Sequence, residues 1–501
     1  QGLKRPTTAC KQRGGLRNPL SCHPRMEPGR RRPGPGALRR IARLVDHVAV
    51  GDDLVGAAGC SRPWLSACAT SADAAGLHPG RATAAATAGF LRARAIGLPP
   101  NSLGRTGLQV SPIGFGCHRL EDTAEQRNAL TVAVTCGCNL IDVAPNYSDS
   151  AAEQAVGEVL HALFQSGKAR REELVICTKV GNIVGSGLRL ASSRSMEGIA
   201  KVRDDVWHCL DPAWIEEELS RSLQRLRLGC VDVLLLHCPE FASRAPDVDM
   251  EEVYRRLGRA FGHLEEEVAR GRIARYGVTA AFYPLRPTEP EHLLLGRVLE
   301  LLPANHHFEV IQLPLNFAEP QALLQGHTAR NAEGAALDKQ QGLTAPPLVE
   351  LARQHGLAIL TNRPLDGLYR ELRGVLRFAS EAPLNGEMQG EDLDELEAKI
   401  TALCAPGLGD PEEPITEELA PKTVKVLASL GVADSVLVGM RRVEYVAGIV
   451  RLLGQTPPID AKAALNAVQS AHNAISMWFC MAAAEEADHG TAKDWRLPAR
   501  G

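Results

Sequence analysis

The chain has 501 residues, of which 45% are hydrophobic and 23% are charged. This balance is typical of a protein that buries a large core, and it excludes a chain that is disordered throughout. The net charge of −3 hides an asymmetry, because the first hundred residues hold 16 Lys or Arg against 5 Asp or Glu and the remainder is acidic. The longest apolar run, Ile475–Ala484, is about half the roughly 18 residues that a membrane span needs, so no transmembrane segment is predicted.

The 13 cysteines are odd in number and scattered, and some lie within apolar runs, as Cys177 does in LVICTK. This distribution predicts reduced, buried thiols in a reducing compartment, not a disulfide framework. Neither Cys136 with Cys138 nor Cys60 with Cys68 has the paired spacing or the histidine partners of a zinc site. We therefore predict no metal site.

Residues 1–98 are rich in Arg, Ala, Gly and Pro, contain runs such as RATAAATAGF, and show no sustained period of 2 or 3.6. We expect this N-terminal extension to stay outside the core and to be disordered or a targeting segment. Its basic, acid-poor composition resembles an organelle transit peptide. A disordered tail or mistranslated upstream sequence is an equal alternative, so the predicted location is cytoplasmic, or chloroplast or mitochondrial if the segment directs import.

From Leu103 onward, short apolar runs of strand length alternate with segments of helical spacing, which predicts repeated strand and helix units. Eight units within residues 99–455 predict an α/β fold, a (β/α)8 TIM barrel. An open doubly wound sheet is disfavoured because no Gly-x-Gly-x-x-Gly follows the first strand. The eight predicted strands are Pro112–Gly116, Asn139–Asp142, Leu174–Lys179, Val231–His237, Arg275–Thr279, Val310–Leu313, Leu357–Thr361 and Ser435–Gly439.

Between these strands, helical spacing predicts helices at Pro212–Leu226, where Asp211 can cap the first turn, and at Met250–Arg270. An acidic insertion punctuated by Pro and Gly, at about residues 368–421, interrupts the rhythm after the seventh strand. We expect it to be a surface excursion, with a lid over the active-site face as the alternative. Residues 456–501 are predicted to form a C-terminal helix and a charged tail.

Reactive side chains stand at the ends of three predicted strands. Asp142 closes NLID, Lys179 closes LVICTK and His237 closes VDVLLLH, while Tyr147 lies five residues past Asp142. Because the carboxyl ends of barrel strands surround one pocket mouth, these four residues are expected to converge. Each alone has a structural explanation, as a helix cap, a solvated lysine, a core histidine or a packing tyrosine.

Taken together, these motifs resemble the aldo-keto reductase family over roughly Leu103 to Leu453. DVAPNY has the family's Asp-x-Ala-x-x-Tyr spacing, and Glu153 and Gly157 resemble the positions that follow it. The other matching segments, in the family's order, are LGRTGLQVSPIGFG, VICTKVG, WIEEELSRSLQRLRLGCVDVLLLHCPE, GRIARYGVTA, VIQLPLN, RPLDGL and SVLVGMRRVEYV.

The resemblance implies a catalytic tetrad. Hydride transfer to a carbonyl leaves negative charge on its oxygen, which must be stabilised and protonated. Tyr147 is then the proton donor, and the Lys179 ammonium favours its phenolate. Asp142 holds Lys179 in place, and His237 hydrogen-bonds the substrate oxygen.

The resemblance also implies a nicotinamide cofactor. Thr279 and Gln312 are expected at its carboxamide, although Thr279-Ala280 replaces the family's usual Ser-Asn, and Asn362 stands where an aromatic residue commonly stacks on the ring. Other implied cofactor contacts lie after the seventh and eighth strands. They are Arg363, Pro364, Leu365, Gly439, Arg441 and Arg442.

Because Arg441 and Arg442 could bind a 2′-phosphate, NADP(H) is preferred over NAD(H), with a solvated arginine pair as the alternative. The predicted function is an NAD(P)-dependent oxidoreductase acting on a small-molecule aldehyde, ketone, sugar or alcohol, with no nucleic-acid or membrane partner. There are two alternatives to this function. One is a cofactor-binding regulatory or scaffold barrel with little turnover. The other is an unrelated phosphate-binding barrel, which Gly181, Gly185 and Gly187 do not favour because their spacing does not follow a helix-opening pattern.

Overall fold

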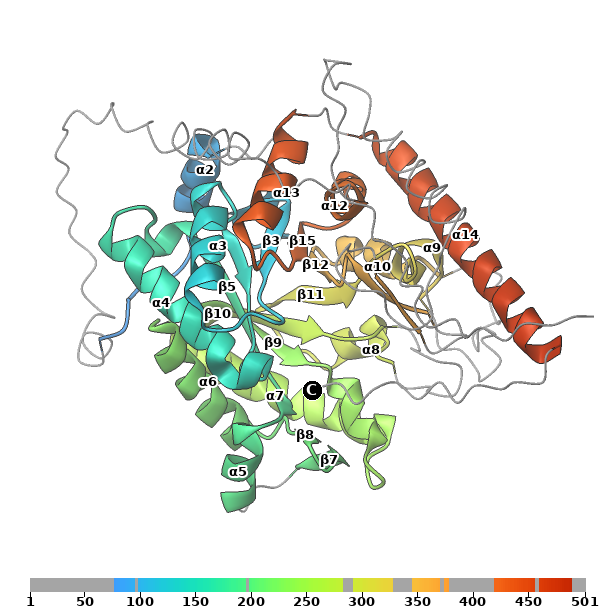
Figure 1. The fold of residues 1–501 in the computed structure, drawn as a ribbon. Coiled ribbons are helices and arrows are strands. Elements are labelled where there is room, and N and C mark those ends of the chain that lie inside the picture. Colours follow the sequence, from blue (N-terminus) through green and yellow to red (C-terminus); the bar gives the residue numbers. More distant parts are fainter. Residues whose placement is uncertain are drawn as a thin grey trace, which may run out of the picture. The chain divides into compact units, whose positions relative to one another are not determined.

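Eight parallel strands close into a barrel at the centre of the computed structural model (Figure 1). The structure describes residues 76–94, 98–194, 198–282, 292–327, 345–369, 374–377, 419–455 and 459–488, all within the second of the chain's two units, residues 47–501. In sequence order the barrel strands are β3 (Ile113–Gly116), β4 (Leu140–Asp142), β5 (Val175–Val180), β9 (Val231–His237), β10 (Ile273–Thr279), β11 (Phe308–Pro314), β12 (Ala358–Asn362) and β15 (Ser435–Val438). The predicted (β/α)8 fold is confirmed, and each predicted strand overlaps the observed one to within two residues.

Alternation along the strands divides the core in two. Leu140, Val175 and Val233 belong to a cluster that also takes in the first residues of the barrel domain, such as Leu103. Their neighbours in sequence, such as Ile176, belong to the larger cluster shared with the surrounding helices. Successive side chains of a strand point to opposite faces, so strands buried on both faces read as continuous apolar runs.

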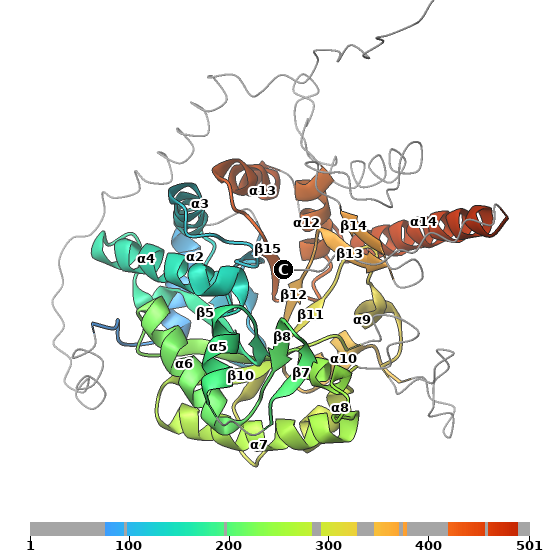
Figure 2. The same ribbon diagram turned by 60° about the horizontal axis from the view of Figure 1, so that its bottom comes forward.

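Helices surround the strands (Figure 2). The predicted helix Pro212–Leu226 is α6, in which Asp211 accepts a hydrogen bond from the Ala213 amide at the N-terminus. The predicted helix Met250–Arg270 is α7, which ends one residue earlier, at Ala269. Other helices of the described ranges are α3 (Ala124–Thr135), α4 (Ala151–Gln165), α8 (Leu295–Glu300), α9 (Gln321–Leu324), α10 (Leu348–Gln354) and α12 (Leu419–Ser429), which lie between barrel strands, and α13 (Val443–Gln455), which follows the last one.

The segment before the barrel contradicts one expectation. The run RATAAATAGF contains most of helix α2 (Ala84–Ala93), whose side chains Phe90 and Leu91 are 1% and 5% exposed and belong to the core. Thr83 caps the helix by accepting a hydrogen bond from the Ala86 amide. The prediction that residues 1–98 stay outside the core is therefore wrong for residues 76–94, and residues 1–75 lie outside the described part.

Two smaller β structures accompany the barrel: a short hairpin before its first strand and a small sheet after its third strand. Strands β1 (Asn101–Ser102) and β2 (Gln109–Val110) pair just before β3. After β5, helix α5 (Ser186–Ser193) stands between the strands of an antiparallel sheet formed by β6 (Asn182–Ile183), β7 (Ala200–Arg203) and β8 (Val206–His208). This excursion was not predicted, because its strands are too short to show a period.

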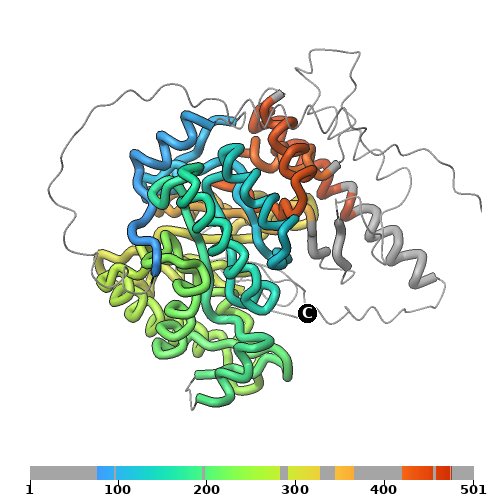
Figure 3. The backbone as a smooth tube through the Cα atoms, turned by 60° about the vertical axis from the view of Figure 1, so that its left-hand side comes forward, coloured from blue at the N-terminus to red at the C-terminus, as the bar shows by residue number. Residues whose placement is uncertain are grey.

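The interval after the seventh strand is only partly described. It opens with the hairpin of β13 (Asp366–Tyr369) and β14 (Gly374–Arg377), while residues 378–418 lie outside the described part. Helix α12 begins at Leu419, so the predicted insertion, 368–421, reaches slightly too far. The predicted C-terminal helix is α14 (Ala461–Asp488), which begins in the last red part of the tube in Figure 3. Its first half contributes Ala464 and Val468 to the core. No helix in the described ranges is long and apolar enough to cross a membrane.

Candidate active site

Polar side chains stand at or near the carboxyl ends of the barrel strands β4, β9, β10, β11 and β12. Asp142, His237 and Thr279 are the last residues of β4, β9 and β10. The strand register places Thr279 opposite both His237 and Gln312. Asn362 ends β12 in the same way. Parallel strands therefore bring together groups that are up to 220 residues apart in the sequence.

Lys179 and Asp142 form a buried ion pair at this end of the barrel. Lys179 Nζ lies 2.6 Å from Asp142 Oδ1 and also donates to the Val143 carbonyl at 3.1 Å. Burial alone would lower the pKa of Lys179, but the carboxylate of Asp142, with Tyr147, more than offsets this and the pKa is raised. Lys179 therefore stays an ammonium at neutral pH.

Tyr147 lies against that ammonium. Its ring centroid is 4.8 Å from Lys179 Nζ and meets the rings of His118 and His237 edge to face at 5.1 and 6.1 Å. Burial raises the pKa of the Tyr147 phenol, while Lys179 opposes that shift. The structure thus places the four residues of the expected tetrad, Asp142, Tyr147, Lys179 and His237, around one point. His118, two residues past the end of β3, was not singled out from the sequence.

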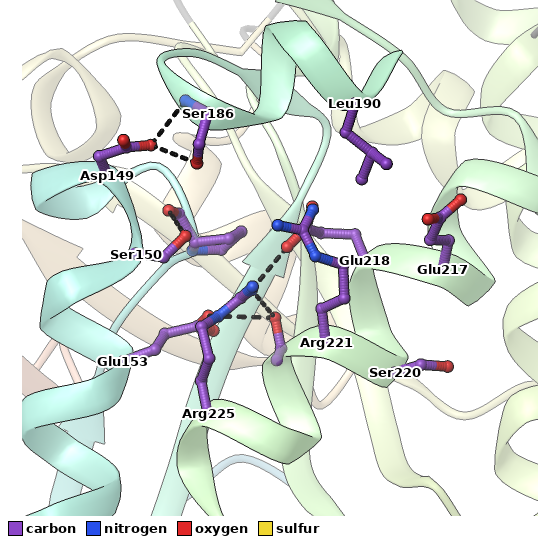
Figure 4. Close-up of polar contacts among 12 residues, drawn as sticks. Asp149, Ser150, Glu153, Ser186, Leu190, Glu217, Glu218, Ser220, Arg221 and Arg225 are labelled. Atoms are coloured by element: carbon purple, nitrogen blue, oxygen red, sulfur yellow. Dashed lines mark hydrogen bonds and ion pairs between the residues drawn. The ribbon is translucent and has the colours of Figure 1, made fainter. Parts of the chain in front are cut away.

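The turn that follows Tyr147 has a strained backbone conformation. Ser148, Asp149 and Ser150 all have positive φ, at 48°, 50° and 74°, a region that residues with a side chain seldom adopt. Asp149 Oδ1 holds the turn by accepting hydrogen bonds from the Ser186 amide at 2.8 Å and the Ser186 hydroxyl at 2.7 Å (Figure 4). Gly185 makes room, because a Cβ there would lie 2.6 Å from Asp149 Oδ1. Helix α5 thereby fixes the turn that orients Tyr147.

Glu153 anchors the helix that follows this turn. Its fully buried carboxylate accepts hydrogen bonds from Thr178 Oγ1 at 2.6 Å, Ser222 Oγ at 3.2 Å and Arg225 Nε at 2.6 Å. Figure 4 shows Glu153 and Arg225 side by side. Since Thr178 precedes Lys179 on β5, the contact joins α4 to the strand that carries the lysine. Gly157 allows α4 and α6 to approach, since a Cβ there would lie 2.1 Å from the Arg225 carbonyl. Both family-like positions have structural roles.

A second histidine, His208, makes a hydrogen bond to the backbone of His237. His208, on β8, is 1% exposed, and its Nε2 lies 3.0 Å from the His237 carbonyl oxygen. Because a carbonyl oxygen only accepts, Nε2 must carry the proton. Burial lowers the pKa of His237 well below its usual range, and the Lys179 ammonium lowers it further, so His237 is neutral. No local sequence signal marked His208, because its partner lies 29 residues away.

A chain of side-chain hydrogen bonds connects the ion pair to the predicted carboxamide residues. Gln312 Nε2 donates to Asp142 Oδ2 at 2.7 Å. Gln312 Oε1 accepts from Thr279 Oγ1 at 3.0 Å and from Asn362 Nδ2 at 3.1 Å. Asn362 Oδ1 is buried and has no hydrogen-bond partner within the described ranges. A nicotinamide carboxamide fits this set, since it carries both a donor and an acceptor.

The other predicted cofactor residues lie at the same end, on loops. Arg363 has φ +54° and its Nη1 lies 3.7 Å from Glu319 Oε1, while Pro364 and Leu365 follow it directly. The sequence predicted Gly439, Arg441 and Arg442 near the eighth strand. They stand between β15 and the first residue of α13, where a helix N-terminus favours an anion. Arg442 Nε is loosely paired with Glu125 Oε1 at 3.9 Å. These positions fit a dinucleotide phosphate.

One group of described residues has the composition of a metal site. The side-chain ligand atoms of Glu216, His263 and Glu267 lie within 4.8 Å of one another on α6 and α7. However, Glu267 already binds Arg272 at 2.5 Å and Arg270 at 2.8 Å. Two guanidinium groups at the same carboxylate disfavour a cation there, and the group is better explained as an ion-pair network.

The chain is similar to known proteins over part of its length. The sequence profile of the Aldo/keto reductase family matches residues 112–284. These residues span strands β3 to β10 and contain Asp142, Tyr147, Lys179 and His237, on which the predicted resemblance rests. Two curated relatives are a candidate voltage-gated potassium channel subunit beta of Schizosaccharomyces pombe, 32% identical over 163 residues, and the NADH-specific methylglyoxal reductase of Escherichia coli, 33% identical over 145 residues.

These alignments are partial. They cover 32% and 28% of this chain, and the chain spans only 40% of the length of each relative. Among solved structures, the holo form of the aldo-keto reductase AKR11C1 from Bacillus halodurans is similar, with 19% identity, a TM-score of 0.49, and coverage of 75% of this chain and 96% of that one.

Proposed function

We propose that this protein is an NAD(P)-dependent oxidoreductase that interconverts a small carbonyl compound and its alcohol. The observation that carries the proposal is the buried Lys179–Asp142 ion pair, with Nζ and Oδ1 2.6 Å apart, beneath the ring of Tyr147. His237 lies beside that ring. A phenol, an ammonium and a neutral imidazole at one point are the groups that carbonyl reduction needs.

Tyr147 acts as the general acid in this proposal. Because burial raises the pKa of its phenol, the hydroxyl keeps its proton at neutral pH and can give it to a substrate oxygen. The Lys179 ammonium stabilises the phenolate that is left, and Asp142 keeps the ammonium in place. His237, held neutral, donates an N–H to the same substrate oxygen and orients it. A bound nicotinamide would supply or accept the hydride.

The cofactor in this proposal is NADP(H) in preference to NAD(H). Thr279 and Gln312 lie where the nicotinamide end would be held. Arg363, Pro364, Leu365 and Gly439 line the path of the dinucleotide along the loops. The two arginines before α13, Arg441 and Arg442, can bind a 2′-phosphate with planar, multiply donating guanidinium groups. The Escherichia coli relative is NADH-specific by name, so both cofactors belong in any assay.

The first experiment measures turnover of a panel of aldehydes, ketones and sugars with NADPH and NADH, and of alcohols with the oxidised cofactors. Reduction should exceed oxidation at neutral pH, since the raised pKa keeps Tyr147 protonated. NADPH should give the higher kcat/KM. Absence of turnover with every pair, in a protein that is folded, would overturn the proposal.

The second experiment replaces the acid. Tyr147→Phe keeps the ring but removes the proton and should lower kcat by roughly 10²–10⁴-fold, with little change in cofactor Kd. Lys179→Met should cause a comparable loss, because it removes the positive charge that lowers the pKa of Tyr147. The double variant should be hardly slower than either single one, since the two residues act as a unit. Near-normal turnover by Tyr147→Phe would rule out the assignment.

A second candidate function is a cofactor-binding regulatory or scaffold barrel. It is favoured by the Schizosaccharomyces pombe relative, which is named as a channel subunit. The same assays separate the two functions, because a scaffold would bind NADPH without appreciable turnover of any substrate. The substrate class, the location in the cytoplasm or an organelle, and the absence of nucleic-acid or membrane partners remain proposals from the sequence.

A further inference from the structure

Asn362 presents an unused hydrogen-bond acceptor at the carboxyl end of the barrel. Its Oδ1 is buried and has no partner in the described part of the chain, while its Nδ2 donates to Gln312 Oε1 at 3.1 Å. A buried polar atom without a partner is costly, so such an atom in a site points to a ligand that supplies the missing group.

The direction in which Asn362 points follows from the network around it. The carboxylate of Asp142 can only accept, so Gln312 must turn its amide nitrogen toward it, at 2.7 Å. Gln312 Oε1 must then face away from Asp142, toward Thr279 and Asn362. Because Oε1 is an acceptor, Asn362 can approach it only with Nδ2. The acceptor Oδ1 of Asn362 is therefore left for another donor.

Gln312 cannot serve as that acceptor itself. Its single oxygen already takes hydrogen bonds from Thr279 and from Asn362, which uses both of its lone pairs. What Gln312 retains is one N–H, because its nitrogen has two protons and Asp142 takes one. Among the described residues, Gln312 thus offers a free donor beside the free acceptor of Asn362.

We propose that Asn362 is the residue that recognises the NH2 of the nicotinamide carboxamide, accepting a hydrogen bond at Oδ1. This inference rests on the proposed function. The carboxamide is the only hydrogen-bonding substituent of the nicotinamide ring, with an oxygen that accepts and an NH2 that donates. The free N–H of Gln312 matches the oxygen, and Asn362 Oδ1 matches the NH2. Ala280, which stands where the family usually has Asn, has no side-chain acceptor. The acceptor for the NH2 therefore comes from Asn362, at the end of β12.

The test compares two ligands in direct binding, by calorimetry, with the full-length protein. NADP⁺ carries the carboxamide, and its 3-acetylpyridine analogue replaces the NH2 with a methyl group while keeping the carbonyl oxygen. The wild-type protein should bind NADP⁺ about 2- to 10-fold more tightly than the analogue, as expected for one neutral hydrogen bond. In Asn362→Leu, which has no acceptor, this preference should disappear, chiefly because NADP⁺ binds more weakly.

Asn101→Leu is the matched control. Asn101 is also partly buried and also donates through its amide, to the Asp434 carbonyl at 3.0 Å, but that carbonyl directly precedes β15, at the amino end of the barrel. This variant should keep the wild-type preference. Equal affinity of the wild-type protein for the two ligands would overturn the inference even if Asn362→Leu failed to fold. Failure to bind NADP⁺ or NAD⁺ at all would instead overturn the proposed function.

Discussion

Single hydrogen bonds decide which atom each side chain presents at the candidate site. The Asp142 carboxylate orients both Lys179 and Gln312, because all of its oxygen atoms are acceptors. Through Gln312 it also sets the direction of Asn362. A change at Asp142 is therefore expected to alter proton chemistry and cofactor recognition together.

His208 gives a prediction about pH and stability. Burial lowers its pKa to about 4, although the hydrogen bond to His237 opposes the shift, whereas in the unfolded chain it titrates near pH 6.5. Between those values the unfolded state binds more protons. Stability is therefore full above about pH 6.5 and falls as pH drops toward about 4, by up to about 1.4 kcal/mol per pH unit.

The measurement is urea unfolding across that pH range. His208→Gln keeps an N–H for the His237 carbonyl but does not titrate, so the free energy of unfolding should fall less steeply with acid than in the wild-type protein. His237, whose pKa is also lowered, retains part of the dependence. His355→Gln, at an exposed histidine, should leave the slope unchanged. An identical slope in His208→Gln would contradict the assignment.

Among the elements, helix α2 contributes stability without approaching the candidate site. Phe90 is 1% exposed and packs in the core shared by the barrel helices. The helix contacts the segment around Arg171–Glu173 and the strand β2, which directly precede β5 and β3, at the amino end of the barrel. The sequence did not predict this helix. Only two of its apolar side chains are large, so it shows no clear helical period, and it lies within a segment of basic composition.

Phe90→Ala should lower the free energy of unfolding by about 3–5 kcal/mol, the range for truncating a large buried aromatic side chain. The affinity of the folded protein for NADP⁺ should not change. Denaturant titration measures the first quantity and calorimetry the second. Arg92→Ala, on the exposed face of α2, is the control and should change stability by no more than about 0.5 kcal/mol. A fully stable Phe90→Ala variant would mean that α2 is dispensable.

Across the whole molecule, the two ends of the barrel have separate tasks. The carboxyl ends hold the four residues of the predicted tetrad. At the amino ends, buried aspartates accept backbone hydrogen bonds from neighbouring segments. Asp232 accepts from the amides of Ala82 and Ile176, at 2.6 and 2.8 Å, and pairs with Arg171 at 2.9 Å. Asp434 likewise accepts a hydrogen bond from the Gly104 amide.

Asp232→Ala should therefore cost stability and not chemistry. It leaves the guanidinium of Arg171, whose side chain is 4% exposed, without its carboxylate, and breaking such a buried pair typically destabilises by about 3–5 kcal/mol. The kcat of the folded fraction should stay near the wild-type value. Adding Arg171→Leu should recover part of the loss, as unfolding in urea would reveal. Lost cofactor binding in a stable Asp232→Ala protein would count against this division.

The amino-acid sequence by itself determined the eight barrel strands, the helices α6 and α7, and the spacing of Asp142, Tyr147, Lys179 and His237. These features are local, because apolar runs in strands, helical periodicity and helix caps depend on neighbouring residues. The repeated order of strand and helix units then brings the carboxyl ends of the parallel strands together. The match of residues 112–284 to the Aldo/keto reductase family follows from the same motifs. The roles of the tetrad residues stay predictions.

Only the tertiary structure decided how α2 joins the core, how Asp149 and Ser186 hold the Tyr147 turn, and that Asn362 presents a free acceptor. The physical reason is separation along the chain. Gln312 meets Asp142 across 170 residues, and the orientation of its amide depends on that contact. No pattern of neighbouring residues encodes it, because an amide has no preferred direction until a partner that can only accept lies within hydrogen-bond distance.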